Sequence, residues 1–263
     1  NRIKKFYNSI MLRSDLIIAG SNFIFNHINT NYSKYLNTKK KLMVIFRGIN
    51  TDYFSKKNIS EAKIDKLISS WKIEKDKTTI LLPGRITKWK GQEMFIEAIN
   101  ILSEDFYKTN FQAIILGSDQ GRKVYSKKLI GLIERYQLGK KIKFFNHCRE
   151  MPTAYAISDI IVSSSIEPEA FGRVSVEAQS MKRPIIASDI GGSKETIIDN
   201  RTGLLFKSED PKSLSEKIDN IFRSDDTTLN AMGNNGRKNV EQKFNVEKMC
   251  FSTYSEYKKL INA

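Results

Sequence analysis

A regular alternation of short apolar runs with amphipathic stretches, from Thr78 to Phe222, constrains the fold more than any other feature of this sequence. The apolar runs, such as TTILLPG and FQAIILG, predict buried strands. The stretches between them, such as GQEMFIEAINILSE, repeat apolar residues at helical spacing. Strands that alternate with helices pair in parallel and are covered by helices. The sequence therefore predicts an α/β domain with a doubly wound parallel sheet, whose ligands bind at the carboxyl ends of the strands.

The predicted elements divide the chain into four parts. In the alternating part, strands are predicted at 78–84, 111–117, 141–146, 159–164, 183–188 and 202–206, and helices at 91–104, 126–139, 151–158, 172–182, 193–199 and 211–222. The opening segment adds strands at 14–21 and 41–49 around a helix at 22–32, too little to close a sheet alone. We therefore predict a remnant of a second domain at 1–50, a linker and helix at 51–77, the α/β domain at 78–222, and C-terminal helices at 223–263, around 227–244 and 246–261.

The charge of the chain is strongly basic. Lys and Arg outnumber Asp and Glu by 44 to 29, and the net charge of +15 favours anionic partners. Residues 1–60 hold 11 basic and 2 acidic side chains, with the densest run at Lys39, Lys40 and Lys41. This excess fits either peripheral contact with an acidic membrane surface or a solvated basic face. The sequence has no aromatic and basic recognition motif, so nucleic acid is not an expected partner.

Cysteine usage and hydropathy indicate the compartment. Cys148 and Cys250 lie far apart and form neither a metal-ligand spacing nor a disulfide framework. No apolar run reaches the length of a membrane span, and no signal-peptide pattern opens the chain. We therefore predict a cytoplasmic location. Because the sequence opens on Asn1 rather than Met, we expect it to begin inside a longer product.

The first candidate site follows the first strand of the alternating part. Gly84 and Arg85 end the strand, and Lys90 and Gly91 lie just before the next helix. A helix N-terminus offers free N–H groups and a positive dipole, and an Arg with a Lys five residues later can close on a diphosphate. These residues alone are equally compatible with an ordinary loop that carries two solvated cations.

A second candidate site follows the strand DIIVSS. Glu169 lies in the loop after that strand, and Glu177 projects about one turn into the next helix. Between them, Phe171 and Gly172 bring backbone amides to the helix start, where the amides can bind a phosphate or sugar oxygen. The two carboxylates can accept hydrogen bonds from hydroxyl groups. The alternative is a helix-capping acid and a surface acid with no ligand.

Six motifs in order support a family resemblance: RGINTDYF, GRITKWKG, LGSDQG, EAFGRVSVEA, SDIGGSKETIIDNRTGLLF and MGNNGRKNVEQKF. Together they resemble retaining glycosyltransferase family 4, also described as glycosyl transferases group 1, which has the two-domain GT-B fold. The resemblance implies a Rossmann-like nucleotide-sugar-binding domain from about Thr78 to Phe222. It also implies that residues 1–50 are the last part of an incomplete second Rossmann-like domain, which in the family binds the acceptor.

The resemblance also implies roles for individual residues. Donor-binding residues are Gly84, Arg85, Lys90, Glu169, Phe171, Gly172, Arg173 and Glu177, and the catalytic ones among them are Arg85, Lys90 and Glu169. Arg85 and Lys90 would hold the donor diphosphate, Glu169 the hydroxyls of the transferred sugar, and Glu177 the ribose hydroxyls. Phe171, Gly172 and Arg173 would present backbone amides near the phosphates.

Several positions near these motifs are less specific. Where the family has Pro beside the first Glu, this chain has Ala170, with Pro168 displaced to the other side, a change that affects loop rigidity more than chemistry. Gly191 and Gly192 allow a tight loop, with or without a ligand contact. His147 follows a strand at its carboxyl end, where its backbone could border the base pocket, and His27 is given no role.

The implied function is transfer of a sugar, with retention, from a nucleoside-diphosphate sugar to a saccharide or lipid-linked acceptor. Such an enzyme is hexosyltransferase-like, of class EC 2.4, and would serve lipopolysaccharide, polysaccharide or glycolipid biosynthesis in the cytoplasm or at the inner face of the membrane. No cofactor and no metal are expected, because Arg85 and Lys90 can stabilise the departing diphosphate. The alternative is a non-catalytic, nucleotide-sugar-binding fragment of a truncated enzyme.

Overall fold

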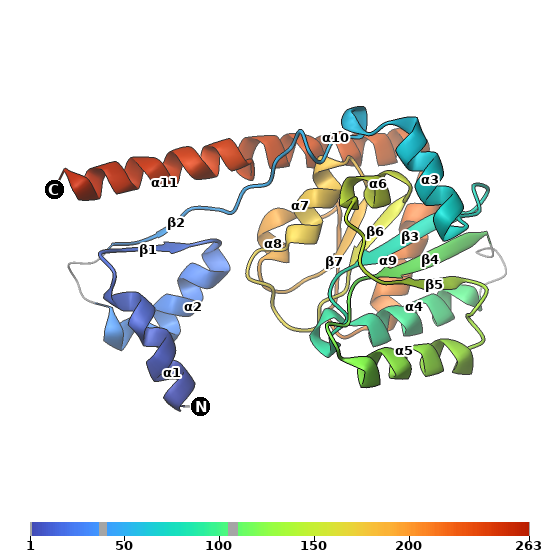
Figure 1. Cartoon of the computed structure of the whole chain (residues 1–263), viewed down its shortest axis with the longest axis horizontal. Helices are drawn as coiled ribbons and strands as arrows, with labels where there is room; N and C mark the ends of the chain where they lie inside the picture. The colour runs from blue at the N-terminus through green and yellow to red at the C-terminus, as the bar shows by residue number, and fades with distance from the viewer. Residues whose placement is uncertain (1, 37–40, 105–109, 263) are drawn as a thin grey trace.

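The computed structural model describes residues 2–36, 41–104 and 110–262 of the chain. A small lobe near the N-terminus and a large lobe lie side by side, and helix α11 (Val246–Ile261) extends from the large lobe over the small one (Figure 1). None of the described helices is both long enough and apolar enough to span a bilayer.

The large lobe is built on a six-stranded sheet in which all paired strands run parallel. Its spatial order is β5-β4-β3-β6-β7-β8, formed by β3 (Thr78–Pro83), β4 (Phe111–Leu116), β5 (Ile142–Phe145), β6 (Ile160–Ser163), β7 (Ile185–Ser188) and β8 (Leu204–Phe206). Every residue of β4, β6 and β7 is buried, as expected for central parallel strands covered on both faces. The predicted doubly wound parallel sheet is confirmed.

Helices cover both faces of this sheet. One face carries α4 (Gln92–Ser103), α5 (Lys123–Arg135) and α9 (Pro211–Arg223), and the other carries α3 (Glu61–Trp71), α6 (Met151–Ala156), α7 (Arg173–Ser180) and α10 (Asp226–Lys243). Phe95 of α4 and Leu214 of α9 are fully buried in the first core, and Tyr155 of α6 and Val240 of α10 in the second. The alternating apolar pattern of the sequence thus becomes two hydrophobic layers on one sheet.

The small lobe is a two-stranded α/β unit. Its two strands, β1 (Leu16–Ala19) and β2 (Lys41–Val44), pair in parallel, with α1 (Arg2–Ser9) and α2 (Asn22–Tyr32) beside them. The described residues of α2 include no buried one. The described part of this lobe therefore has little core of its own, and the remnant of a second domain predicted at 1–50 stays a prediction.

Some predicted boundaries differ from the structure. The predicted strand 41–49 ends at Val44, because the chain then leaves β1 and crosses to the large lobe. The predicted helix 193–199 is the single turn α8 (Ser193–Thr196), since the amide of Ile198 donates to the hydroxyl of Thr202 rather than to a helical carbonyl. Helix α1 was not predicted. Of the basic run, Lys39 and Lys40 lie outside the described residues.

Segment 51–77 packs against the large lobe. The ring of Trp71 stacks on Phe145 of β5, with 4.6 Å between ring centroids and an interplanar angle of 12°. Phe54 is 4% exposed and lies edge-on to Tyr155. The helix α3 predicted in this segment therefore contributes directly to the second hydrophobic layer.

Two connections join the lobes, and they lie against each other. The first is the segment after β2, and the second is the junction between α10 and α11 (Figure 1). The amide of Ile49 donates to the carbonyl of Phe244 (2.9 Å), and the amide of Val246 donates to the carbonyl of Ile49 (3.0 Å). The two connections are thus hydrogen-bonded to each other where they cross between the lobes.

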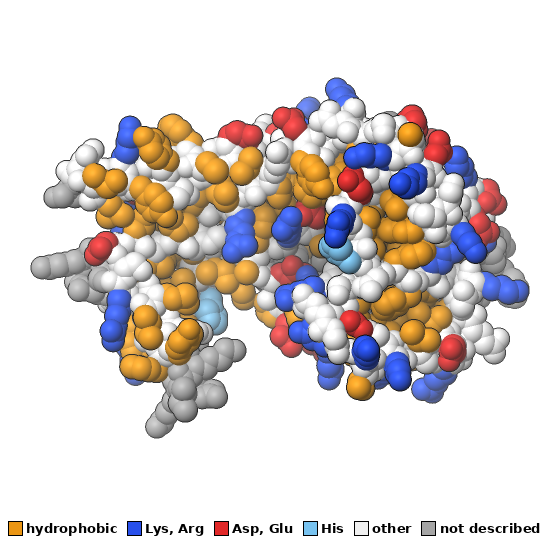
Figure 2. Space-filling model, in the orientation of Figure 1, with side chains coloured by type: hydrophobic (Ala, Val, Ile, Leu, Met, Phe, Trp, Pro, Cys, Tyr) orange, Lys and Arg blue, Asp and Glu red, His pale blue; other side chains and the backbone are white. Residues whose placement is uncertain are grey.

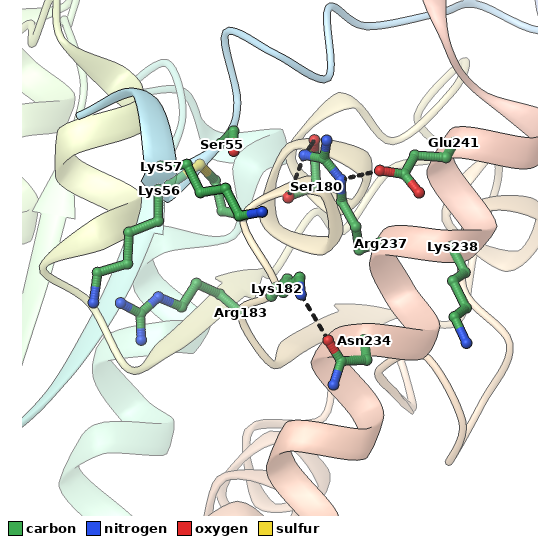
Figure 3. Close-up of a pocket in the computed structure, with 11 residues that line it drawn as sticks. Ser55, Lys56, Lys57, Ser180, Lys182, Arg183, Asn234, Arg237, Lys238 and Glu241 are labelled. Carbon is green, nitrogen blue, oxygen red and sulfur yellow. Dashed lines mark hydrogen bonds and ion pairs between the residues drawn. The ribbon is translucent and has the colours of Figure 1, made fainter.

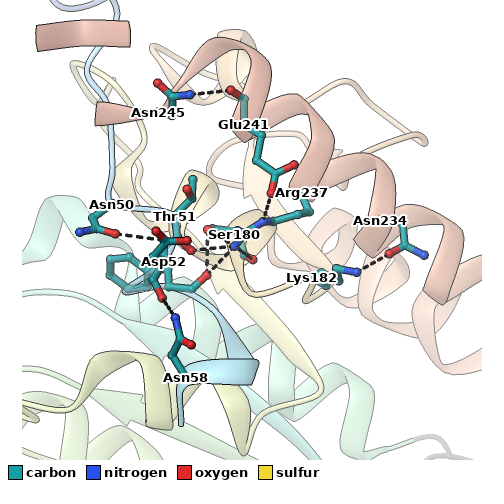
Figure 4. Close-up of polar contacts among 11 residues, drawn as sticks. Asn50, Thr51, Asp52, Asn58, Ser180, Lys182, Asn234, Arg237, Glu241 and Asn245 are labelled. Carbon is teal, nitrogen blue, oxygen red and sulfur yellow. Dashed lines mark hydrogen bonds and ion pairs between the residues drawn. The ribbon is translucent and has the colours of Figure 1, made fainter. Parts of the chain in front are cut away.

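Arg237 of α10 fixes the first connection to the large lobe, as Figure 4 shows. One guanidinium nitrogen donates to the carbonyls of Thr51 (2.8 Å), Phe54 (2.9 Å) and Ser180 (2.9 Å), and Nε donates to Glu241 (2.5 Å). The Arg237 side chain is only 16% exposed. A planar, always charged guanidinium can serve several carbonyls at once, which a lysine ammonium cannot do in the same geometry.

We expect Arg237→Ala to lower the free energy of unfolding by about 2–4 kcal/mol, because it leaves several carbonyls without their donor. Arg237→Lys should recover less than half of that loss. Urea denaturation measures both values. The control is Arg223→Ala, which removes an arginine that is 67% exposed and paired with Asp219, and should change stability by less than about 1 kcal/mol. Equal effects of the two alanine variants would contradict the role given to Arg237.

Candidate functional site

The strand order of the large lobe reverses between β3 and β6, and the loops after these two strands lie in contact. The amide of Ile166 donates to the carbonyl of Trp89 (2.8 Å), and the hydroxyl of Ser164 donates to the carbonyl of Lys90 (3.0 Å). Gly91 has a φ of 69°, and a Cβ there would lie 1.9 Å from the carbonyl oxygen of Ser164. Only glycine allows this approach. Ligands of such folds bind at this reversal point.

Lys90 and Glu169 meet where these two loops touch. Their side chains form an ion pair of 2.7 Å, although only 14% and 10% of them, respectively, are exposed. The hydroxyl of Ser165 donates to the same oxygen of Glu169. A charge so poorly hydrated is stable only with a partner and hydrogen bonds, so Lys90 and Ser165 hold the carboxylate of Glu169 in one place.

Arg85 differs from Lys90 because it is exposed and, within the described part of the chain, has no carboxylate partner. Its guanidinium lies 5.6 Å from the centroid of the Trp89 ring, and the ammonium of Lys90 lies 4.4 Å from that centroid. The indole therefore lies close to both cations and limits their freedom. Gly84 packs beside the stem of Lys90, so the first candidate site forms as a unit.

The loop that carries Glu169 is held by the turn at Gly191 and Gly192. The amide of Gly192 donates to the carbonyl of Glu169 (2.7 Å). Gly191 has a φ of 57°, and a Cβ on it would lie 2.7 Å from both the amide nitrogen and the carbonyl oxygen of Glu169. The tight loop predicted at these glycines therefore supports the candidate site by backbone contact.

The N-terminus of α7 lies beside this loop. Among the described residues, the amides of Phe171, Gly172 and Arg173 donate to no protein acceptor, while the ring of Phe171 is buried against Phe244. Three consecutive amides without a protein acceptor, at the positive end of a helix dipole, can bind an anion. The buried hydroxyls of Thr87, Ser175 and Ser188 are likewise without a partner in the protein.

Glu177 lies deeper, and the structure gives it two partners. One carboxylate oxygen accepts from the hydroxyl of Tyr155 (2.7 Å), and the other from Nε of Arg173 (2.6 Å). The hydrogen bond to Glu177 raises the pKa of Arg173, and burial, followed by the charge of Glu177, raises the pKa of Tyr155. Tyr155 was missed in the sequence, where it is one apolar position in a short helix.

Other features fall outside this site. His147 is exposed near Trp71, and His27 lies near Phe23 and Tyr32 in the small lobe. No three His, Cys, Asp or Glu side chains of the described ranges are grouped to hold a metal ion. A notch between the lobes, bordered by several Lys and Arg side chains, is visible in Figure 2.

A basic cavity lies at the connection between the lobes instead of at the reversal point. It has a volume of about 630 Å³ and is lined by Lys56, Lys57, Lys182, Arg183 and Arg237, among others (Figure 3). Lys182 donates to Asn234, and Arg183 to the carbonyl of Ala156. Both of these hydrogen bonds lie within the large lobe, and the cavity contains none of the candidate site residues.

We expect Tyr155→Phe to lower the free energy of unfolding by about 1–3 kcal/mol, because it leaves a buried carboxylate oxygen of Glu177 without its donor. Thermal or urea unfolding checks this value. Tyr257→Phe removes an equivalent hydroxyl from a side chain that is 52% exposed on α11, and should change stability by less than about 0.5 kcal/mol. If Tyr155→Phe left the free energy of unfolding unchanged, the hydrogen bond between Tyr155 and Glu177 would add no stability.

The fold defines the class of the protein: an α/β protein of GT-B type with a Rossmann-like large lobe. The sequence signature described as "Glycosyl transferases group 1" matches residues 63–239, which is more than half of the chain. The chain belongs to this glycosyltransferase family.

Individual relatives agree with this assignment. The chain is 26% identical over 233 residues to the capsular polysaccharide biosynthesis glycosyltransferase CapM of Staphylococcus aureus, covering 88% of this chain and 58% of CapM. It is 30% identical over 222 residues to an uncharacterised glycosyltransferase of Methanocaldococcus jannaschii, covering 83% of this chain and 54% of that protein. The chain thus spans little more than half the length of these relatives.

Solved structures show the same fold. A glycosyltransferase from Rickettsia africae superposes with a TM-score of 0.89 at 34% identity, over 99% of this chain and 67% of that one. The HepE protein of Anabaena, solved in complex with UDP and glucose, superposes with a TM-score of 0.82 at 23% identity, over 94% of this chain and 64% of that one. The second likeness shows the fold alone.

Proposed function

We propose that this chain is the donor-binding part of a retaining glycosyltransferase of family 4, which transfers a sugar from a nucleoside-diphosphate sugar to an acceptor. The observation that carries the proposal is the meeting of Arg85, Lys90, Glu169 and the free amides of α7 at the reversal of strand order. Cations and amides suit a diphosphate, and a fixed carboxylate suits sugar hydroxyls.

The diphosphate would lie between the cations and the N-terminus of α7. Arg85 is exposed and has no carboxylate partner in the described chain, so its guanidinium can bind two phosphate oxygens without breaking an ion pair. Lys90 can reach a phosphate while it stays close to Glu169. The amides of Phe171, Gly172 and Arg173 supply further donors without a side-chain entropy cost.

The two carboxylates would hold the two sugars of the donor. Glu169 has one oxygen occupied by Lys90 and Ser165, which leaves the other for hydroxyls of the transferred sugar. Glu177 uses one lone pair on each oxygen for Tyr155 and Arg173. An ionised carboxylate accepts about four hydrogen bonds, so lone pairs remain for ribose hydroxyls.

In the reaction, the bond between the sugar and the diphosphate breaks through a transition state with oxocarbenium character. The acceptor hydroxyl oxygen bonds to the same carbon, and its proton passes to the departing diphosphate. Negative charge then accumulates on the departing diphosphate. Arg85, Lys90 and the α7 amides stabilise that charge more strongly in the transition state than in the ground state, which lowers the barrier. We propose that this set acts without a cofactor or metal ion.

The acceptor is proposed to be a saccharide or lipid-linked group in polysaccharide, lipopolysaccharide or glycolipid synthesis, in the cytoplasm or at the inner face of the membrane. The name of CapM and the basic excess of the chain support this pathway and setting. A second candidate is a nucleotide-sugar-binding chain without activity. This candidate is considered because the chain aligns with only 58% of the length of CapM.

Calorimetry with UDP, GDP and ADP tests the phosphate site. We expect one of these nucleotides to bind, and Arg85→Ala and Lys90→Ala each to weaken its affinity about 10- to 100-fold, since each removes a charge-assisted hydrogen bond. Lys88→Ala is the matched control, because Lys88 is exposed in the same loop and should leave affinity within about two-fold. Unchanged affinity in both site variants would overturn the assignment.

Activity separates the two candidates. In the chain extended by its natural upstream residues, we expect sugar transfer, and Glu169→Gln should lower kcat by about 100-fold or more because it removes a charge beside the reacting sugar. Glu167→Gln, two residues earlier and exposed, should stay within about three-fold. Nucleotide binding without any transfer would favour the non-catalytic candidate.

A further inference from the structure

The first turn of α2 obtains its hydrogen-bond acceptors from both lobes. The N-cap residue Ser21 accepts from the amide of Ile24 (3.2 Å), as a serine in this position normally does. The amides of Asn22 and Phe23, the two preceding donors, are bound by the carboxylate of Glu195 at 2.8 and 2.5 Å. Glu195 belongs to α8 of the large lobe. Two otherwise orphaned donors of the small lobe are thus satisfied from the other lobe.

This contact is electrostatically favourable and geometrically specific. Each oxygen of the Glu195 carboxylate takes one backbone amide, and the side-chain amide of Asn22 adds a third hydrogen bond (2.9 Å). A carboxylate at the N-terminus of a helix also interacts with the positive end of the helix dipole. Without Glu195, the amides of Asn22 and Phe23 would have to turn to water.

Ser21 connects the same helix turn to the loop of Glu169. Its hydroxyl donates to the carbonyl of Ala170 (2.5 Å), and Ser21 is completely buried. On its other side, that loop is bound by Gly192, whose amide donates to the carbonyl of Glu169. Glu195 follows Gly192 by three residues. The hydrogen bonds that Ser21 and Gly192 donate to the loop therefore come from segments that Glu195 holds next to each other.

From these contacts we infer that Glu195 is a positioning residue. It fixes the first turn of α2 on the large lobe, and Ser21 in that turn then holds the loop that carries Glu169. The inference rests on the proposed function in assigning Glu169 to the transferred sugar. Glu195 itself is not one of the residues proposed to contact the donor. When Glu195 is lost, the lobes separate at α2 and the loop loses the hydrogen bond that Ser21 donates to Ala170.

Amide hydrogen exchange, followed by NMR on this chain, tests the contact itself. We expect Glu195→Ala to speed exchange at Asn22 and Phe23 by about ten-fold or more, and Glu195→Gln, which keeps an acceptor oxygen, to give a smaller increase. Amides of β7 and α10 should be unaffected. The matched control is Glu216→Ala, an exposed glutamate of α9 with no hydrogen bond to other described residues. Unchanged exchange at α2, or equal acceleration throughout the large lobe, would overturn the inference.

Kinetics of the upstream-extended enzyme test the consequence for the site. We expect Glu195→Ala to lower kcat about ten-fold while affinity for the nucleotide stays within two-fold, because the phosphate contacts come from the large lobe alone. Glu195→Gln should restore most of the rate. An unchanged kcat, or a loss of nucleotide affinity as large as the loss of kcat, would overturn the positioning role. A failure of the proposed function would be recognised separately. In that case the unmodified chain would bind no nucleotide, whatever the amide exchange rates at α2.

Discussion

The parallel pairing of β3 with β6 is the constraint on which the rest of the structure depends. It places two strands that are far apart in sequence side by side, with Ile80 opposite Ile160. The loops that follow these strands therefore leave the sheet at one edge and in opposite directions, which opens a space between them. The cations come from one loop and Glu169 from the other. Any change that separates the loops, such as a side chain at Gly91, would dismantle the site without touching a charged residue.

The Lys90–Glu169 pair shows how two poorly hydrated charges stay stable in the protein. Both groups are largely removed from water, and each would be costly to bury alone. Under the proposed function, phosphates would add to the cation side of this pair and hydroxyls to the carboxylate side. The two side chains that compensate each other's charge would then also recognise the ligand. The buried carboxylate of Glu177 is likewise stabilised by two partners in the protein, Tyr155 and Arg173.

The sequence predicts local and periodic features well and long-range contacts poorly. The strands β3 and β4 and helix α4 follow directly from apolar periodicity, and Arg85, Lys90 and Glu169 from their positions at strand ends. The depth of Glu177 and its bond to Tyr155 depend on how α6 packs against α7, which no local pattern encodes. Strand 41–49 is shorter than predicted because its apolar residues serve a crossing between lobes as well as a sheet. Glu195 lies in the motif SDIGGSKETIIDNRTGLLF, but no local pattern predicts its contact with amides 172 and 173 residues away.

Helix α11 has a consequence for the order in which the molecule is made. Lys41 of β2 is paired with Glu256 of α11 at 2.6 Å, across a sequence separation of 215 residues. Lys41 leaves the ribosome long before Glu256, so β2 lacks this partner until nearly the whole described chain has been synthesised. The large lobe, from β3 to α10, is synthesised before α11 and can form its sheet in the meantime. During translation β2 therefore stays open to chaperones or to premature strand pairing until α11 has been made.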